Sequence, residues 1–229
     1  MDGAAFFETI LLSLNIGVIS TAANLPLAVG AVFVLTRFDF RGKTIVDGLI
    51  NLPLVMPPVT TGYLLLIVFG KNGLIGSVLF DAFGIRIAFT TAAAVLASMV
   101  VSFPLIVKNI KVSMEMVDTR LEKAAMTLGA GRVAAFFRVT LPLIKPGILS
   151  GMIVGFARSL GEFGATMTFA GNIQGETRTI PLSVYSFLQI PGKEKEAALL
   201  VAISICISFL AMLLSNSRIL GVRKRRSGA

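Results

Sequence analysis

The sequence predicts an all-α integral membrane protein with about five transmembrane helices, and three observations support this fold class. Of the 229 residues, 55% are hydrophobic and only 14% are charged, whereas a soluble domain carries about 25% charged residues. The mean hydropathy is +0.86. Uncharged stretches of about 20 residues recur, which is the length at which a helix crosses the hydrocarbon core of a bilayer. We expect one transmembrane domain, 1–229.

Four of these stretches are long enough to be spans. They lie between Glu8 and Arg37 (28 residues), Asp47 and Lys71 (23), Arg86 and Lys108 (21), and Glu196 and Arg218 (21). The first is preceded by acidic residues and is too long for the core of a signal peptide, so we expect a helix that is retained. A fifth span is expected from about Pro146 to Ala170.

The distribution of Lys and Arg orients these spans. Outside the spans, one side of the membrane receives fifteen basic residues and the other receives five. The positive-inside rule then places the N-terminus outside and the C-terminus, with its Arg-Lys-Arg-Arg run, in the cytoplasm. The net charge of +9 is therefore a property of membrane topology and does not indicate a nucleic-acid partner.

Pro57 and Pro58 interrupt the second span. Two adjacent prolines remove two backbone donors and must break or kink the helix. The bilayer tolerates such a break only where protein or an aqueous cavity satisfies the freed carbonyl groups. The break is therefore either a packing kink or part of a transport pathway. Thr60, Thr61 and Ser102 are hydroxyls near this break and the third span, and they either donate to a passing anion or bond their own helix carbonyls.

Arg158 and Glu162 are the only ionisable residues within the fifth span. They are four residues apart, which places them on one helical face. Ionisable groups at membrane depth face protein or water, so this pair is either structural or part of an anion pathway. Gly147, Gly151 and Gly155 repeat at four-residue spacing, which lets this helix approach another helix of the same chain or of a second copy.

The external side carries the loop 171–196. Within it, residues 179–192 are uncharged, but 14 residues are too few for a span. We expect an interfacial or re-entrant element on the outer face.

The largest cytoplasmic segment is 109–145. Thr119 and Glu122 match a capping box, and Gly129 provides a stop, so a helix is expected over about 120–128. An apolar side is expected from Leu121, Ala124, Ala125 and Leu128. The opposite face mixes Arg120, Glu122 and Lys123, unlike the uniformly cationic face of a helix that lies on anionic lipid. A groove in a partner protein is the expected receptor.

Catalytic chemistry has few residues to draw on. The chain has no His and a single Cys, which excludes a Ser-His-Asp triad and a Cys/His zinc site. Cys206 is expected to be a buried small apolar residue. Gly42-Lys43-Thr44 echoes the end of a Walker A motif, but Arg37 stands where the motif needs Gly and no strand precedes it. We expect no catalytic site, cofactor or metal in this chain.

Several segments resemble a known family. The run from Glu122 to Ala130, followed by Leu141-Pro142 and Pro146-Gly147, resembles the "EAA" loop of the membrane subunits of ABC importers of type I. One departure is that Lys123 stands where the family has Glu. The segments Phe40–Lys43, Leu52–Val59, Arg158–Ala165 and Gly175–Pro181 are similar to molybdate permeases of the ModB type.

The resemblance implies a homodimer around a central pathway, two ATPase subunits that hold ATP and Mg and grip the loop helix, and an external molybdate-binding protein. Leu121, Glu122, Lys123, Ala124, Ala125, Leu128 and Gly129 would form the contact with the ATPase. The expected function is translocation of molybdate, or of tungstate, across the inner membrane. The alternatives are a sulfate-type permease and an ion-coupled secondary carrier. A carrier is expected to show an internal repeat and midplane acids, and neither is evident.

Overall fold

The computed structural model describes residues 3–226, and the described part of the chain is helical without strands. The elements in chain order are α1 Gly3–Arg37, α2 Lys43–Val55, α3 Pro58–Phe69, α4 Gly76–Phe83, α5 Thr91–Glu115, α6 Thr119–Thr127, α7 Arg132–Ala135, the π-helix η1 Phe136–Thr140, α8 Leu141–Leu160, α9 Gly164–Phe169, α10 Ile180–Leu188 and α11 Glu194–Arg226.

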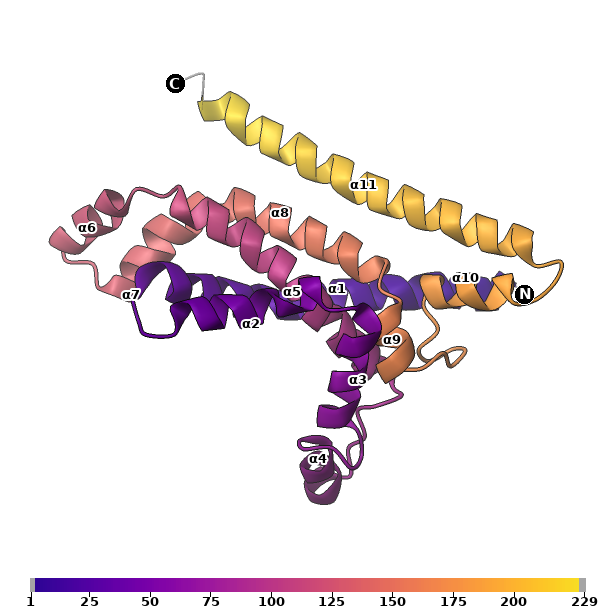
Figure 1. Ribbon diagram of the computed structural model, residues 1–229. Helices are drawn as coiled ribbons and strands as arrows, with labels where there is room; N and C mark the ends of the chain where they lie inside the picture. The colour runs from indigo at the N-terminus through magenta and orange to yellow at the C-terminus, as the bar shows by residue number, and fades with distance from the viewer. Residues whose placement is uncertain (1–2, 227–229) are drawn as a thin grey trace.

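Within residues 3–226, four helical segments are long and apolar enough to cross a membrane, and a fifth span results if one bent pair is counted. The four are Ala5–Arg37, Thr91–Glu115, Arg132–Leu160 and Glu194–Leu213. The bent pair is α2 with α3, whose axes differ by 117° across the Pro57 break. Figure 1 shows α3 and α4 leaving the bundle at this bend. The all-α membrane fold with about five spans is thus confirmed.

Helices α1, α5 and α8 form the centre of the bundle. Val32 of α1, Ile110 of α5 and Ile144 of α8 belong to one cluster of buried residues that joins these helices. The glycine ridge of α8 faces α5 of the same chain, since a Cβ atom added at Gly155 would lie 2.6 Å from the Ile106 side chain. The sequence did not show whether the helix that packs against these glycines belongs to the same subunit. The structure shows that it is α5 of the same chain.

The fifth expected span is shifted toward the N-terminus. The helical segment begins at Arg132, passes through the π-helix η1 and ends at Leu160, rather than running from Pro146 to Ala170. Pro146 lies inside α8. A break at Gly161 separates α8 from the short α9. This span is therefore followed by a second interruption that the hydropathy of the sequence did not indicate.

Helix α11 is the least buried of the long helices, with 11% of its most apolar window buried. Cys206 on this helix is exposed, so the expectation of a buried residue was wrong. Uncharged apolar sequence cannot distinguish a lipid-facing helix from a core helix, because both surroundings accept the same side chains.

The two ends of the bundle differ in content. Helix α6 and the C-terminal end of α11 lie at one end, whereas α10 and the start of α1 lie at the other (Figure 1). The nine residues of α10 are too few to cross a bilayer, in keeping with the expectation for 179–192.

Candidate functional site

Helix α6 begins at Thr119 and ends at Thr127, within one residue of the expected 120–128. Its cap differs from the expectation. The Asp118 carboxylate accepts a hydrogen bond of 2.9 Å from the Arg120 N–H, so Asp118 replaces Thr119 as the capping residue. The capping box predicted for Thr119 and Glu122 is therefore wrong. Gly129 has φ +91°, a left-handed conformation that favours glycine and ends the helix as predicted.

The apolar side chains of α6 are exposed. Leu121 is 48% exposed and Leu128 is 89% exposed. Ala124 is also exposed, whereas Ala125 is half-buried. Large apolar side chains on a short helix at one end of a membrane bundle indicate a docking contact. Lys123 is exposed as well, so its ammonium is free to meet a partner.

Glu122 does not point away from the protein. Its carboxylate forms an ion pair of 2.6 Å with Arg37 at the end of α1, and Thr140 of η1 donates a hydrogen bond to the same oxygen. Both charged side chains are 16% exposed. The expectation that Glu122 shares the outer face with Lys123 is therefore corrected. We name Arg37, Glu122 and Thr140 the coupling-helix anchor.

No sequence signal pointed to this anchor. Arg37 and Glu122 are 85 residues apart, and each has the sequence context of an ordinary charged residue between spans. The anchor joins α6 directly to the end of α1 and to the start of the α8 span. A displacement of α6 therefore acts on both helices.

The break in α2–α3 packs against the break between α8 and α9. Gly164 at the start of α9 lies so close to Pro58 that an added Cβ would be 2.8 Å from the proline Cβ. An added Cβ on Gly62 of α3 would lie 2.6 Å from the Ala165 carbonyl oxygen. Two helix interruptions thus meet in one place, which we name the break junction. Pro57 and Pro58 are exposed beside it.

Arg158 and Glu162 meet at this junction. Their side chains form an ion pair of 2.7 Å, with Glu162 1% exposed and Arg158 31% exposed. Glu162 lies beyond the end of α8, so the prediction of one continuous helical face was wrong, although the contact is present. The second carboxylate oxygen accepts a hydrogen bond of 2.9 Å from the Ala165 N–H. Glu162 therefore joins the end of α8 to the start of α9.

The predicted hydroxyls have different surroundings. Thr60 is exposed. Thr61 is 5% exposed, and its hydroxyl has no hydrogen-bond partner among the described residues. Ser102 is fully buried and donates to the Ser98 carbonyl at 2.6 Å, while it accepts from Asn24 at 3.1 Å. The structure therefore favours the structural alternative for Ser102 and leaves Thr60 and Thr61 as pathway candidates.

The loop between α9 and α10 is held by Arg178. Its guanidinium donates to the Asn172 side-chain oxygen at 2.8 Å, and the Asn172 amide donates to Ser186 of α10 at 2.8 Å. Thr91 at the start of α5 donates to the Glu176 carbonyl at 2.8 Å. The loop thus has a defined shape on the end of the bundle opposite α6.

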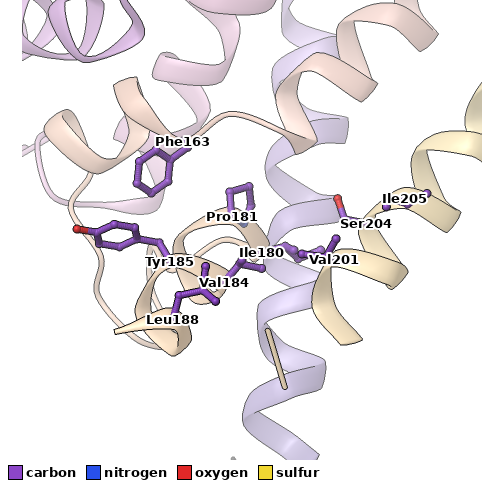
Figure 2. Close-up of a pocket in the computed structure, with 9 residues that line it drawn as sticks. All are labelled: Phe163, Ile180, Pro181, Val184, Tyr185, Leu188, Val201, Ser204 and Ile205. Atoms are coloured by element: carbon purple, nitrogen blue, oxygen red, sulfur yellow. The ribbon is translucent and has the colours of Figure 1, made fainter. Parts of the chain in front are cut away.

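Two apolar hollows are poor places for an anion. One of about 400 Å³ lies between Phe163, α10 and α11 and is lined by Pro181, Tyr185, Val201 and their neighbours (Figure 2). Another of about 530 Å³ lies between α1 and the η1–α8 segment. Transfer of a charge into such surroundings is strongly unfavourable. Within residues 3–226, no group of three or more His, Cys, Asp or Glu side chains is placed to hold a metal ion.

Comparison with known proteins gives the family. Residues 8–225 match the family model "Binding-protein-dependent transport system inner membrane component". The chain is 52% identical over 209 residues to the molybdenum transport system permease protein ModB of Haemophilus influenzae, covering 91% of each chain. It is 50% identical to ModB of Escherichia coli K12, covering 92% of each. The sulfate transport system permease protein CysW of Synechococcus elongatus is 38% identical, with coverage of 90% of this chain and 73% of CysW.

Solved structures show the same fold at low sequence identity. A bacterial ABC transporter for alginate import gives a TM-score of 0.72 at 15% identity, covering 93% of this chain and 78% of that one. The methionine ABC transporter MetNI gives 0.70 at 16% identity, covering 96% and 94%. The ion-coupled carrier is thereby set aside. The chain is a multi-pass inner-membrane protein that belongs to the family of binding-protein-dependent transport system inner membrane components.

Proposed function

We propose that this chain conducts molybdate, or tungstate, across the inner membrane as the permease subunit of an ATP-driven importer. The observation that carries the proposal is the identity of 50–52% to two ModB proteins over more than nine tenths of the chain. Sulfate is the second candidate, because the 38% identity to CysW extends over nearly the same length. These ions are tetrahedral dianions, so one pathway chemistry serves all of them.

The proposed assembly is a homodimer of this chain with two ATPase subunits and an external binding protein. ATP and Mg would be held by the ATPase, and this chain would carry out no hydrolysis. Exposed Leu121 and Leu128 support a groove on the ATPase as the receptor of α6. The loop held by Arg178 supports the opposite end as the face for the binding protein.

Force would pass from α6 into the membrane through the coupling-helix anchor. When the ATPase subunits move, α6 moves with them, and the ion pair to Arg37 and the hydrogen bond from Thr140 transmit the displacement to α1 and α8. The far end of α8 carries Arg158, which is joined to the break junction through Glu162. The junction would act as the gate. Both helices are already interrupted there, so they can bend apart while breaking fewer backbone hydrogen bonds than intact helices would.

We further propose that the N-terminus and α10 lie outside the membrane and that α6 and the C-terminus lie on the cytoplasmic side. A cysteine at Gly3, in a Cys206→Ala background, should react with an impermeant thiol reagent added from outside. A cysteine at Ser227, which lies outside the described residues, should react only after permeabilisation. The reverse pattern would refute the orientation.

The transport proposal is tested by uptake into vesicles that contain the whole complex. Radiolabelled molybdate should enter only with ATP and the binding protein, and excess tungstate should compete better than excess sulfate. Stronger competition by sulfate would support the second candidate. Uptake without an ATPase would refute both.

The role of α6 is tested with Ala125→Asp. The substitution places a carboxylate without an evident partner in an apolar contact, at about 1–3 kcal/mol or more. We expect normal membrane insertion but loss of co-purification with the ATPase and loss of uptake. Thr119→Asp is the matched control, because it puts a carboxylate at an exposed position of the same helix that is not among the proposed docking residues. Full association of the Ala125→Asp variant would place the docking contact elsewhere.

A further inference from the structure

A third hollow in the described part of the chain differs from the apolar ones in its lining. It has a volume of about 330 Å³ and lies between α5 and α8, lined by Lys108, Asn109, Val112, Ser113, Met116, Gly147 and Ser150. Four of these seven residues carry polar side chains. At about 30 Å³ for each water, the hollow holds on the order of ten water molecules, which is enough for a small inorganic ion with part of its hydration shell.

The lysine in this hollow carries an uncompensated charge. Lys111, one turn further along α5, is paired with Asp47 of α2 at 3.0 Å. Lys108 has no carboxylate within ion-pair distance among the described residues. It lies seven residues before the end of α5, about 10 Å along the helix axis. A charged group inside a membrane span faces protein or water rather than lipid.

Hydrogen bonds join the two helices that form the walls of the hollow. The Asn109 amide donates to the Leu105 carbonyl at 2.8 Å, and its oxygen accepts from Ser150 of α8 at 3.0 Å. This link joins the two helices and uses both polar ends of Asn109. Gly147 has no side chain, and the space where its Cβ would lie is taken by Ser113.

Two donors remain available in the hollow. Within residues 3–226, the Ser113 hydroxyl makes no hydrogen bond to another residue, and the three N–H groups of Lys108 are unpaired. An ammonium with a hydroxyl suits an oxyanion, which accepts hydrogen bonds on every oxygen. The exposure of Lys108 keeps the attraction weak, as a pathway requires, because an ion that binds too tightly cannot leave.

We propose that the hollow around Lys108 and Ser113 is a low-affinity binding site for a tetrahedral oxyanion on the cytoplasmic side of the break junction. This inference rests on the proposed function, since the ion would reach the hollow after passing the gate. The site would attract the anion inward from the junction and release it to the cytoplasm.

The first test measures uptake by the intact complex in proteoliposomes at subsaturating substrate. Loss of one charge-assisted contact is worth about tenfold in affinity, so Lys108→Gln should lower the uptake of molybdate severalfold. Lys108→Arg, which keeps the charge, should remain near wild type. Lys111→Gln is the matched control, because its lysine is on the same helix but outside the hollow. All variants should still bind the ATPase and hydrolyse ATP when the loaded binding protein is added.

The second test measures binding without transport. Val112 lines the hollow and is 53% exposed, so Val112→Cys in a Cys206→Ala background reports access to it. Millimolar molybdate or sulfate should slow the reaction of this cysteine with an uncharged maleimide. The protection should disappear with Lys108→Gln and should be absent for Glu115→Cys, an exposed position on the same helix that does not line the hollow.

The outcomes separate this site from the transport proposal. Wild-type uptake with no effect of Lys108→Gln, or protection that survives Lys108→Gln, would overturn the site and leave the function standing. A wild-type complex that imports no oxyanion would overturn the proposed function. In that case, Lys108-dependent protection by sulfate would still support anion binding in the hollow, and its absence would refute it.

Discussion

Two arginine–glutamate pairs in this chain have the same chemistry but different geometry. The Arg158–Glu162 pair is local, spans four residues and buries only its glutamate, which is 1% exposed against 31% for the arginine. The Arg37–Glu122 pair joins residues 85 positions apart, and both side chains are 16% exposed. One pair joins the end of α8 to the start of α9, whereas the other attaches α6 to two spans.

The burial of each pair decides what it contributes to stability. A nearly buried carboxylate depends on its counterion, because an unpaired buried charge is strongly destabilising. A pair with two moderately exposed partners contributes less to stability. The Arg37–Glu122 pair instead links separate elements. Arg37 of α1 and Thr140 of η1 both bind the Glu122 carboxylate of α6.

The largest effect is expected from Arg158→Ala. It leaves the Glu162 carboxylate without its cation and should destabilise the fold by about 3–5 kcal/mol. Glu162→Gln should destabilise less, because the partly exposed Arg158 retains access to water. The double variant, Arg158→Ala with Glu162→Gln, should be milder than Arg158→Ala alone, because it leaves no unpaired charge. Unfolding in detergent measures the order, and equal losses for both single variants would contradict it.

The same double variant separates structure from transport. If it assembles with normal stability but no longer moves substrate, the pair belongs to the pathway. Normal uptake would assign it a purely structural role.

An intermediate effect is expected from the coupling-helix anchor. Glu122→Gln removes one charge and should weaken the attachment of α6 by about 1–3 kcal/mol. We expect lower uptake per ATP hydrolysed, with the ATPase still bound, because the proposed docking contact is anchored at the exposed Leu121 and Leu128. The charge exchange Arg37→Glu with Glu122→Arg should recover part of the coupling. Loss of ATPase binding in Glu122→Gln would show that this glutamate serves docking instead.

A smaller effect is expected from Thr140→Val, which removes the second donor to Glu122 but preserves side-chain shape. The loss should be about 1 kcal/mol and should leave the ion pair intact. Hydrogen exchange over 116–131 measures the loosening of the loop. Protection equal to wild type would show that the ion pair alone holds α6.

The smallest effect is expected from Lys193 and Glu196 at the start of α11. Their side chains form a partly exposed ion pair of 2.7 Å. Their hydrogen bond and charge attraction raise the pKa of Lys193, so on the alkaline side the pair persists until the pH rises above the usual range of lysine. Glu196→Gln should change neither stability nor uptake measurably. A loss comparable to that of Glu122→Gln would show that exposure does not rank these pairs.

Sequence reasoning located the elements that depend on local composition. The long apolar stretches predicted spans, the proline pair predicted the break before α3, and Gly129 predicted the end of α6. These features follow from backbone geometry and from the length of chain that crosses a bilayer. The family motifs in the loop also pointed to the helix that carries exposed leucines.

The sequence misplaced features in which two local signals compete. Asp118 rather than Thr119 caps α6. Both residue types are favoured at a helix N-cap, and it is the Asp118 carboxylate that accepts from the Arg120 N–H. The fifth span was drawn too far along the chain, since Gly161 and the following α9 remain apolar enough to continue the hydropathy signal. Cys206 was expected to be buried because an apolar stretch of sequence does not distinguish a lipid-facing helix from a core helix.

Residues near one another in the chain are enough to predict a helical membrane protein with a broken span and a short helix over about 120–128. Only the tertiary structure decided that Glu122 pairs with Arg37 and Thr140, that the two breaks meet at Gly164 and Pro58, and that Lys108 faces a polar hollow. Each of these results from helix packing that joins distant residues. Packing depends on the shape of whole surfaces, so no short segment of sequence encodes it.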